Sequence, residues 1–399
     1  MPSNYKTSSL PPPDNDALAQ SLRLVAVIRQ EIDGAGGRIP FYRYMEQALY
    51  APGLGYYSGG AQKFGKEGDF ITAPELTPLF GQTVAAQAAE IMQMSAPAVI
   101  EAGAGSGVLA ADMLLEFERL GCVPETYGIL EISAELRARQ RQTLSMLAPA
   151  LSSRVVWLDA PPETFSGVVL ANEVLDAMPA HLIVVREGEI FERGVTYTCS
   201  EGEALLAWAD CPARGRVRDA ALTLLAEGAI GTDGDYVTEI NLAAAAWVTD
   251  WGTRLRHGAL LLFDYGFPRD EFYSPLRKQG TLMCHYCHRA HDNPFLWPGL
   301  NDITCSVDFT AMAEAGFNAG LEVLGYTSQG EFLLNCGLLD HLARREMASD
   351  ASSYAKASGA AQKLTQPREM GELFKVLALG RGLDSPLMGF AFGNRVHTL

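Results

Sequence analysis

Three alternate glycines stand between a short apolar run and a helical pattern. The apolar run begins at Ala98 and contains Glu101, and it is followed by Gly103, Gly105 and Gly107. Glycine lacks a Cβ, so it suits positions where the chain bends sharply and where a ligand touches the backbone. A strand, a tight turn and a helix in this order predict a pocket of the nucleotide-binding type, with Glu101 beside the ligand.

The spacing of the glycines narrows the choice of nucleotide. A dinucleotide-binding fingerprint would place its third glycine where Val108 stands, and the Lys-Ser or Lys-Thr pair of a P-loop does not follow. A pyrophosphate ligand is therefore disfavoured. The order Glu-x-Gly-x-Gly-x-Gly instead resembles the first motif of class I S-adenosylmethionine (SAM) methyltransferases, whose ligand carries a cationic sulfonium and an amino acid. Another nucleotide-binding fold and a purely structural turn remain the alternatives.

Acids follow the next two predicted strands. Glu131 ends the strand 127–132, roughly twenty residues beyond the last glycine, where a carboxylate can accept hydrogen bonds from both hydroxyls of a ribose. Asp159 follows the strand 155–158 and could meet an adenine amino group. Ligands of open α/β sheets lie across the carboxyl ends of the strands, so both side chains are candidate cofactor contacts. A plain surface acid is the alternative for each.

A dense polar group follows the fourth predicted strand, 167–170. It contains Asn172, Glu173 and Asp176 between apolar residues. Methyl transfer from a sulfonium is an in-line displacement, so an enzyme must hold the donor and the acceptor in line and stabilise positive charge on the acceptor. Paired carboxylates would also orient a guanidinium by forked hydrogen bonds. We therefore expect Glu173 and Asp176 to be catalytic, with Glu75 as a third candidate. A turn-capping role is the alternative for Asp176.

The stretch 284–291 combines a Cys-x-x-Cys pair with interleaved histidines. Zinc can use two thiolates and two imidazoles, but the usual second pair of ligands is missing, and one short loop rarely supplies all four. We therefore expect no metal, and a substrate-facing or structural role for His288 and His291. The seven cysteines are an odd number, spread over the chain, which favours a reducing compartment over a disulfide framework.

Several motifs, taken as an ordered set, resemble one protein family. They are 55–57, 69–75, the glycine turn, 172–173, 176–179, 264–266, 302–304, 307–309, and His288 with His291. The set is similar to the MidA-like methyltransferases and runs from about residue 40 to the C-terminus. That family includes the mitochondrial complex I assembly factor that methylates an arginine of a complex I core subunit. Cys287 departs from the basic or polar residue expected there.

The resemblance implies an α/β fold: a class I SAM-methyltransferase (Rossmann-like) sheet with an N-terminal helical cap and inserted segments. It implies SAM as the cofactor and protein arginine as the expected acceptor. The expected cofactor contacts are Glu101, Gly103, Gly105, Gly107, Glu131, Asp159, Asn172, Thr72 and Pro74, with Glu75 near the active site. The expected substrate contacts are Tyr56, Asp69, His288 and His291.

The order of elements also favours a parallel sheet with helices on both faces. Helices are expected at 17–32, 40–49, 78–94, 106–120, 134–147, 240–255 and 308–315. Further strands are expected at 258–266, 321–326 and 390–392, and a hairpin of 182–185 and 190–198 turns at Glu187-Gly188. The expected domains are a flexible tail at 1–16, a helical cap with an active-site loop at 17–95, and a core at 96–399 with insertions around 180–235 and 267–305.

Composition limits the partners. A net charge of -16 disfavours nucleic acid, and we expect a protein substrate, such as a respiratory-complex-type subunit, and a homodimer. The sequence shows no transmembrane run and no signal or transit peptide, so a bacterial cytoplasmic location is expected. Two alternatives to a protein arginine methyltransferase stay open. One is a non-catalytic assembly factor that keeps the fold, and the other is a small-molecule methyltransferase.

Overall fold

The computed structural model describes residues 10–59, 72–200, 203–231, 234–348 and 350–399. The chain divides into two compact units. The first comprises residues 1–70, 176–245 and 269–307, and the second comprises 71–175, 246–268 and 308–399. Among the described residues, no helix is both long and apolar enough to cross a bilayer.

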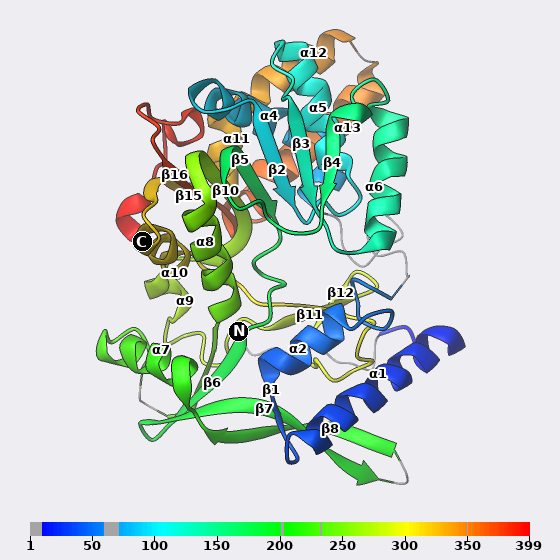
Figure 1. Ribbon diagram of the computed structural model, residues 1–399, viewed down its shortest axis with the longest axis vertical. Coiled ribbons are helices and arrows are strands. Elements are labelled where there is room, and N and C mark those ends of the chain that lie inside the picture. The colour runs from blue at the N-terminus through cyan, green and yellow to red at the C-terminus, as the bar shows by residue number, and fades with distance from the viewer. Residues whose placement is uncertain (1–9, 60–71, 201–202, 232–233, 349) are drawn as a thin grey trace. The chain divides into compact units, whose positions relative to one another are not determined.

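The second unit is built on an open sheet with the strand order β15-β16-β10-β5-β2-β3-β4 (Figure 1). The five strands from β10 to β4 are parallel, whereas β16 is antiparallel to both β10 and β15. The strands are β2 (Ala98–Ala102), β3 (Thr126–Leu130), β4 (Val155–Leu158), β5 (Phe165–Asn172), β10 (Leu255–Phe267), β15 (Glu322–Ser328) and β16 (Phe374–Arg381). The predicted parallel α/β sheet is confirmed.

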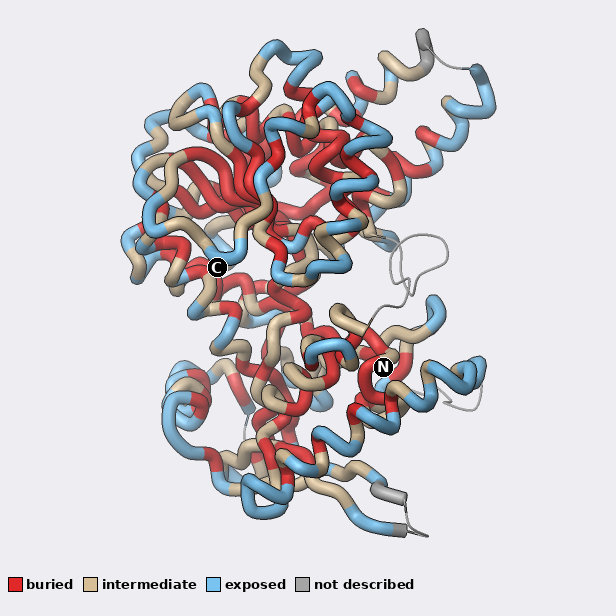
Figure 2. The backbone as a smooth tube through the Cα atoms, turned by 45° about the vertical axis from the view of Figure 1, so that its right-hand side comes forward, coloured by how far each residue is buried: buried red, intermediate tan, exposed pale blue. Residues whose placement is uncertain are grey.

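Helices bury both faces of this sheet. On one face of β10, Ala259, Leu261 and Phe263 belong to a buried apolar cluster to which α4 also contributes. On the other face, Leu260 and Leu262 are buried as well. Because side chains of a strand alternate between faces, β10 is covered on both sides, as a parallel strand requires. Figure 2 shows these strands as buried tube beneath partly exposed helices. The helices are α3 (Ala73–Leu76), α4 (Pro78–Met94), α5 (Val108–Leu120), α6 (Ala134–Leu147), α10 (Phe309–Asn318), α11 (Gln329–Asn335), α12 (Leu338–Ala348), α13 (Ala351–Thr365) and α14 (Met370–Leu373), with 3-10 turns at Ser152–Arg154, Met388–Phe390 and Val396–Thr398.

The first unit carries two antiparallel sheets. One has the order β1-β7-β6-β9 with β8 also paired to β7, and the other has the order β12-β11-β13. The elements are α1 (Asn15–Gly34), β1 (Ile39–Pro40), α2 (Phe41–Tyr50), β6 (His181–Arg186), β7 (Glu189–Ser200), β8 (Glu203–Pro212), α7 (Gly215–Ala226), β9 (Tyr236–Ile240), α9 (Arg269–Phe272), β11 (Met283–Tyr286), β12 (Arg289–His291) and β13 (Asp302–Thr304). Two more elements, α8 (Leu242–Arg254) and β14 (Val307–Asp308), span the boundaries between units.

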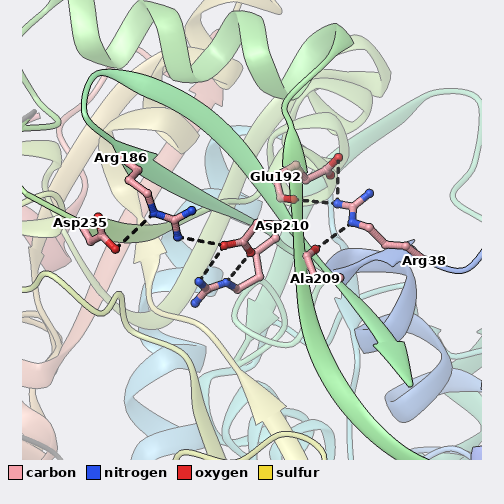
Figure 3. Close-up of polar contacts among 7 residues, drawn as sticks. Arg38, Arg186, Glu192, Ala209, Asp210 and Asp235 are labelled. Atoms are coloured by element: carbon pink, nitrogen blue, oxygen red, sulfur yellow. Dashed lines mark hydrogen bonds and ion pairs between the residues drawn. The ribbon is translucent and has the colours of Figure 1, made fainter. Parts of the chain in front are cut away.

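Charged side chains form hydrogen bonds between strands of the five-stranded sheet in the first unit (Figure 3). Asp210 of β8 accepts hydrogen bonds from Arg186 of β6 and Arg193 of β7 at 2.9–3.2 Å. Arg38 donates to the carbonyl oxygens of Glu192 and Ala209, at 2.7 and 2.9 Å. These bonds join the strands to one another and to Arg38, directly before β1, so we interpret the network as structural.

Several predicted elements need correction. The predicted strand 390–392 is wrong: Phe390 ends a 3-10 turn, and its ring packs on Phe332 with centroids 5.5 Å apart. The last strand is β16, which the sequence reading missed. The stretch 267–304, which shows little periodicity, contains the strands of the three-stranded sheet. The turn predicted at Glu187-Gly188 is confirmed, with φ of 52° and 80°.

Candidate functional site

The glycine turn joins β2 to α5 in the second unit. Gly103, Gly105 and Gly107 have φ of 65°, 51° and 83°, a left-handed backbone that residues with a Cβ adopt only at a cost. Gly107 is the N-cap of α5, and no side chain caps the helix there. The positive end of the helix dipole therefore faces the turn, where an electron-rich ligand group would be stabilised.

Glu101 supports this turn from within the sheet. Its side chain is buried, and the Tyr127 hydroxyl of β3 donates to Oε2 at 2.6 Å. Burial raises the pKa of Glu101 to about 7, and the bond from Tyr127 opposes the rise. The carboxyl group therefore links β2, the strand before the turn, to β3 by a hydrogen bond.

This raised pKa gives a prediction about stability. Between its ordinary pKa of 4.5 and about 7, Glu101 stays protonated in the folded chain and ionises in the unfolded one. The unfolded state then binds fewer protons, so this residue makes the free energy of unfolding fall by about 1.4 kcal/mol per pH unit as pH rises. Glu101→Gln should remove that part of the slope. Urea unfolding of both proteins at pH 5, 6 and 7 measures it, and parallel pH dependences would contradict the assignment.

Glu131 lies just beyond the end of β3 and is 7% exposed. Oε1 accepts a hydrogen bond from the Ser133 backbone N–H at 2.8 Å, and Oε2 accepts one from Gln140 Nε2 at 3.3 Å. Burial raises the pKa of Glu131, and these two bonds oppose the rise. The Ile132 backbone N–H and the charge of Arg137 also lower the pKa of Glu131, so the carboxylate is held from several sides.

Asp159, at the end of β4, has a different setting. Its side chain is 91% exposed, and Oδ1 accepts a hydrogen bond from Arg137 at 2.7 Å. Arg137 also donates to the carbonyl oxygens of Glu131 and Leu158, at 2.6 and 2.9 Å. The arginine thus fixes the backbone at the ends of β3 and β4, beside the glycine turn.

The end of β5 holds the polar group predicted to be catalytic. Asn172 Nδ2 donates to Glu173 Oε1 at 3.2 Å, and Glu173 has a φ of 54°. Two hydrogen bonds to acceptors on β10 hold this conformation. Glu173 N donates to Phe263 O at 2.8 Å, and Leu175 N donates to Asp264 Oδ2 at 3.0 Å. Asn172 Oδ1 is buried and has no hydrogen-bond partner among the described residues. The end of β5 therefore places Glu173, whose backbone conformation is strained, beside the amide oxygen of Asn172.

The short helix α3 brings Glu75 to the glycine turn. The Ser106 hydroxyl, between Gly105 and Gly107, donates to Glu75 Oε1. Thr72 is the N-cap of α3, and Pro74 lies buried in its first turn. The structure therefore brings Glu75 to the turn that carries the predicted cofactor contacts, and Thr72 and Pro74 lie in the same short element.

Other predicted site residues lie in the first unit. Asp176 is 5% exposed, and its carbonyl oxygen accepts a hydrogen bond from Cys305 N at 3.0 Å. Tyr56 is 1% exposed and belongs to the apolar core. Its neighbour Tyr57 donates to Asp302 Oδ1 at 2.9 Å, and burial, then the charges of Asp302 and Asp176 among others, raise the pKa of Tyr57. Acids and tyrosines thus form a buried cluster in this unit.

The two predicted histidines differ in position. His288 is exposed at the tip of the two-residue turn between β11 and β12, where Cys287 and His288 both have a positive φ. His291 is buried, and its Nε2 lies 2.9 Å from Asn301 Oδ1. Burial lowers the pKa of His291, and the contact with Asn301 holds the ring in place. Within the part of the chain that the structure describes, no three His, Cys, Asp or Glu side chains gather as a metal site. The predicted residue Asp69 lies outside the described residues.

Sequence analysis assigned no individual role to several residues around these sites. They are Ser106, Gln140 and Asp264 in the second unit, and Tyr57 in the first. Asp264 and Tyr57 stand in the motifs 264–266 and 55–57 that carry the resemblance, but neither was named as a site residue. Gln140 lies among the polar residues of α6 and stands in no such motif.

Comparisons with known proteins agree with this geometry. A family model for S-adenosyl-L-methionine-dependent methyltransferases matches residues 83–327. A relative in Drosophila melanogaster, named protein arginine methyltransferase NDUFAF7 homolog, mitochondrial, is 28% identical over 395 residues, which cover 89% of this chain and 86% of the relative. The NDUFAF7 protein of Mus musculus is 29% identical over 377 residues, covering 86% and 81%.

One solved structure is more similar in sequence to this chain than these two relatives are. It is a COG1565 superfamily member from Burkholderia thailandensis, crystallised with S-adenosyl-homocysteine. Its sequence is 51% identical, the TM-score is 0.92, and the match covers 98% of this chain and 100% of the other. A native crystal structure of a COG1565 superfamily protein from the same organism gives 51% identity and a TM-score of 0.90.

Proposed function

This chain belongs to the family of S-adenosyl-L-methionine-dependent methyltransferases, and on that premise we propose that it methylates an arginine guanidinium of a protein substrate. The methyltransferase fold, the SAM cofactor and the enzyme class follow from the family. The arginine acceptor is our proposal, supported by relatives that are 26–29% identical and are named protein arginine methyltransferases.

The observation that supports an arginine most directly is the pair at the end of β5. A guanidinium carries five N–H donors in a planar fork and no acceptor. Glu173, anchored by β10, and the uncommitted Oδ1 of Asn172 offer carboxylate and carbonyl oxygens side by side. We propose that they accept N–H bonds from the guanidinium and hold the reacting nitrogen in line with the methyl group.

The reaction needs little from the protein beyond position and charge. SAM supplies a methyl group on a cationic sulfur, which departs as a neutral thioether when the nitrogen forms its new bond to carbon. The methylated nitrogen then loses one proton to solvent. Glu173 would stabilise the positive charge on the acceptor throughout. We propose Asp176 and Glu75 as further acids acting on the same substrate.

The residues of the second unit fit the cofactor. Glycine at the turn lets a ligand approach the backbone, and we propose that the carboxylate of Glu131, held by Ser133 and Gln140, accepts bonds from the ribose hydroxyls. We propose that the turn, with Glu101, Thr72 and Pro74 around it, holds the amino acid and sulfonium end, and that Asp159 lies toward the adenine. Asn172, expected from the sequence to contact the cofactor, is assigned to the acceptor instead. In the first unit, Tyr56, Asp69, His288 and His291 remain proposed substrate contacts.

Labelling tests this function. The purified protein would be incubated with SAM carrying a tritiated methyl group and an extract from cells that lack its gene. After acid hydrolysis, label in methylated arginine supports the proposal. Label confined to small molecules would contradict it and favour a metabolite acceptor. Absence of label, with S-adenosylhomocysteine still bound, would contradict it and favour an assembly role.

The anchor of Glu173 gives a separate prediction. Asp264 accepts hydrogen bonds from Leu175 N and Tyr265 N, one on each oxygen, at 3.0 Å. Asp264→Asn keeps only one acceptor, so the backbone after Glu173 should shift and lower the turnover number about tenfold. Affinity for S-adenosylhomocysteine should stay within about twofold, because the turn is untouched. Steady-state kinetics and calorimetry measure both values. Asp250→Asn, on the surface of α8, is the control, and an unchanged turnover number for Asp264→Asn would contradict the anchoring role.

A further inference from the structure

Gln140 of α6 lies where three parts of the cofactor-binding edge meet. The side chain is fully buried. Its Nε2 donates to the carbonyl oxygen of Gly105 at 3.1 Å and to Glu131 Oε2 at 3.3 Å. Its Oε1 accepts a hydrogen bond from Trp157 Nε1 of β4 at 2.9 Å. One amide group thus joins the glycine turn, the end of β3 and the strand β4.

The indole of Trp157 fixes which way this amide faces. An indole N–H can only donate, so it selects Oε1 of Gln140 and turns Nε2 toward Glu131 and Gly105. Trp157 is itself held by Arg141, whose guanidinium carbon lies 4.5 Å from the ring centroid. The orientation of the amide therefore depends on the indole ring of β4.

Gln140 also packs directly against the glycine turn. A Cβ added at Gly107 would lie 3.1 Å from the Cα of Gln140 and 3.3 Å from its Cβ. The helix that carries Gln140 is therefore in contact with the turn. A change in the position of α6 would be transmitted to both the turn and Glu131.

We propose that Gln140 is a positioning residue that acts through Glu131 and gives this site its preference for an intact ribose diol. The proposal rests on the ribose role of Glu131 given above. Ser133 N holds Oε1 of that carboxylate and Gln140 holds Oε2, so both oxygens are fixed in position. Two oxygens at fixed positions can accept bonds from two neighbouring hydroxyls. Without Gln140 the carboxylate can rotate, and the match to the second hydroxyl is lost.

Calorimetry with two ligands tests this role. The ligands are S-adenosylhomocysteine and its analogue that lacks the ribose 2′-hydroxyl. Gln140→Leu should weaken binding of the first about tenfold, as expected for lost bonds to a charged group, and of the analogue by less than about threefold. Trp157→Phe removes only the indole N–H and should act in the same direction with a smaller effect, which keeps the test valid if Gln140→Leu folds poorly.

A double-mutant cycle separates positioning from mere packing. In a Glu131→Ala background, Gln140→Leu should weaken binding of S-adenosylhomocysteine by less than about twofold further, because both changes remove the same interaction. Equal losses for both ligands would overturn the proposal and leave Gln140 a structural residue. If Glu131→Ala weakens binding and neither Gln140→Leu nor Trp157→Phe does, only the role of Gln140 is wrong. If Glu131→Ala has no effect, the ribose role of Glu131 fails, and the Gln140 proposal with it.

Discussion

Replacing Glu173 by Gln is expected to lower the turnover number for methyl transfer by at least about a hundredfold, the usual cost of losing a group that stabilises transition-state charge. The amide has nearly the same shape as the carboxylate, and it can still contact Asn172. It lacks the negative charge that would offset the positive charge on the acceptor nitrogen, and its NH2 group cannot accept a bond from a guanidinium.

The measurement is single-turnover methyl transfer to the substrate found by labelling, with calorimetry of S-adenosylhomocysteine alongside. Binding of that ligand should change by less than about threefold, since Glu173 is proposed to contact the acceptor. Glu187→Gln is the matched control, because Glu187 is an exposed acid with a φ of 52°, close to the 54° of Glu173. A Glu173→Gln enzyme with undiminished turnover would remove this residue from the mechanism.

Gly107→Ala should weaken binding of S-adenosylhomocysteine by about thirtyfold or more, the combined effect of a left-handed backbone and a displaced helix. The added methyl group would press on the backbone of Gln140, and α6 would have to move by a few tenths of an ångström. That movement shifts Glu131 and the carbonyl of Gly105 together. Glu131 is a proposed contact of the ligand, and Gly105 belongs to the turn that is proposed to hold it.

Gly121→Ala supplies the control for this prediction. Gly121 caps the other end of the same helix α5 with a φ of 70°, and a Cβ there would meet nothing within 4 Å. Both substitutions should cost about 1–2 kcal/mol of stability from backbone strain alone. Only the one at Gly107 should affect the ligand, so thermal unfolding and calorimetry of both variants separate strain from binding. Equal ligand affinities in the two variants would contradict the prediction.

The features that local sequence encodes were predicted well. The strand, turn and helix around Gly105 follow from a continuous run of residues, and the structure places the turn as expected. The same is true of the acid at the end of β3, because Glu131 follows an apolar strand. The bend at Glu187 was also evident, since Glu-Gly separates two apolar runs. Whether Glu131 contacts the cofactor stays a prediction.

Features that depend on tertiary packing could not be read from the chain. Gln140 lies between two arginines on α6 and resembles a solvated position, yet it is fully buried because β4 and the glycine turn meet it. Phe390 is buried by Phe332, far away in sequence, and not by pairing in a strand. Tyr56 and Tyr57 are adjacent and identical, so only packing decides that the first joins the core and the second reaches Asp302.

The division of the chain has a consequence for its synthesis on the ribosome. The polypeptide passes between the two units at 70/71, 175/176, 245/246, 268/269 and 307/308. β5 ends at Asn172, and the strand that pairs with its open edge starts only at Leu255. The strands β6 to β9 are therefore synthesised while the edge of β5 is still unpaired. A translation product that stops between residue 307 and β16 would contain every residue of the first unit but would leave the sheet of the second unit unfinished and exposed.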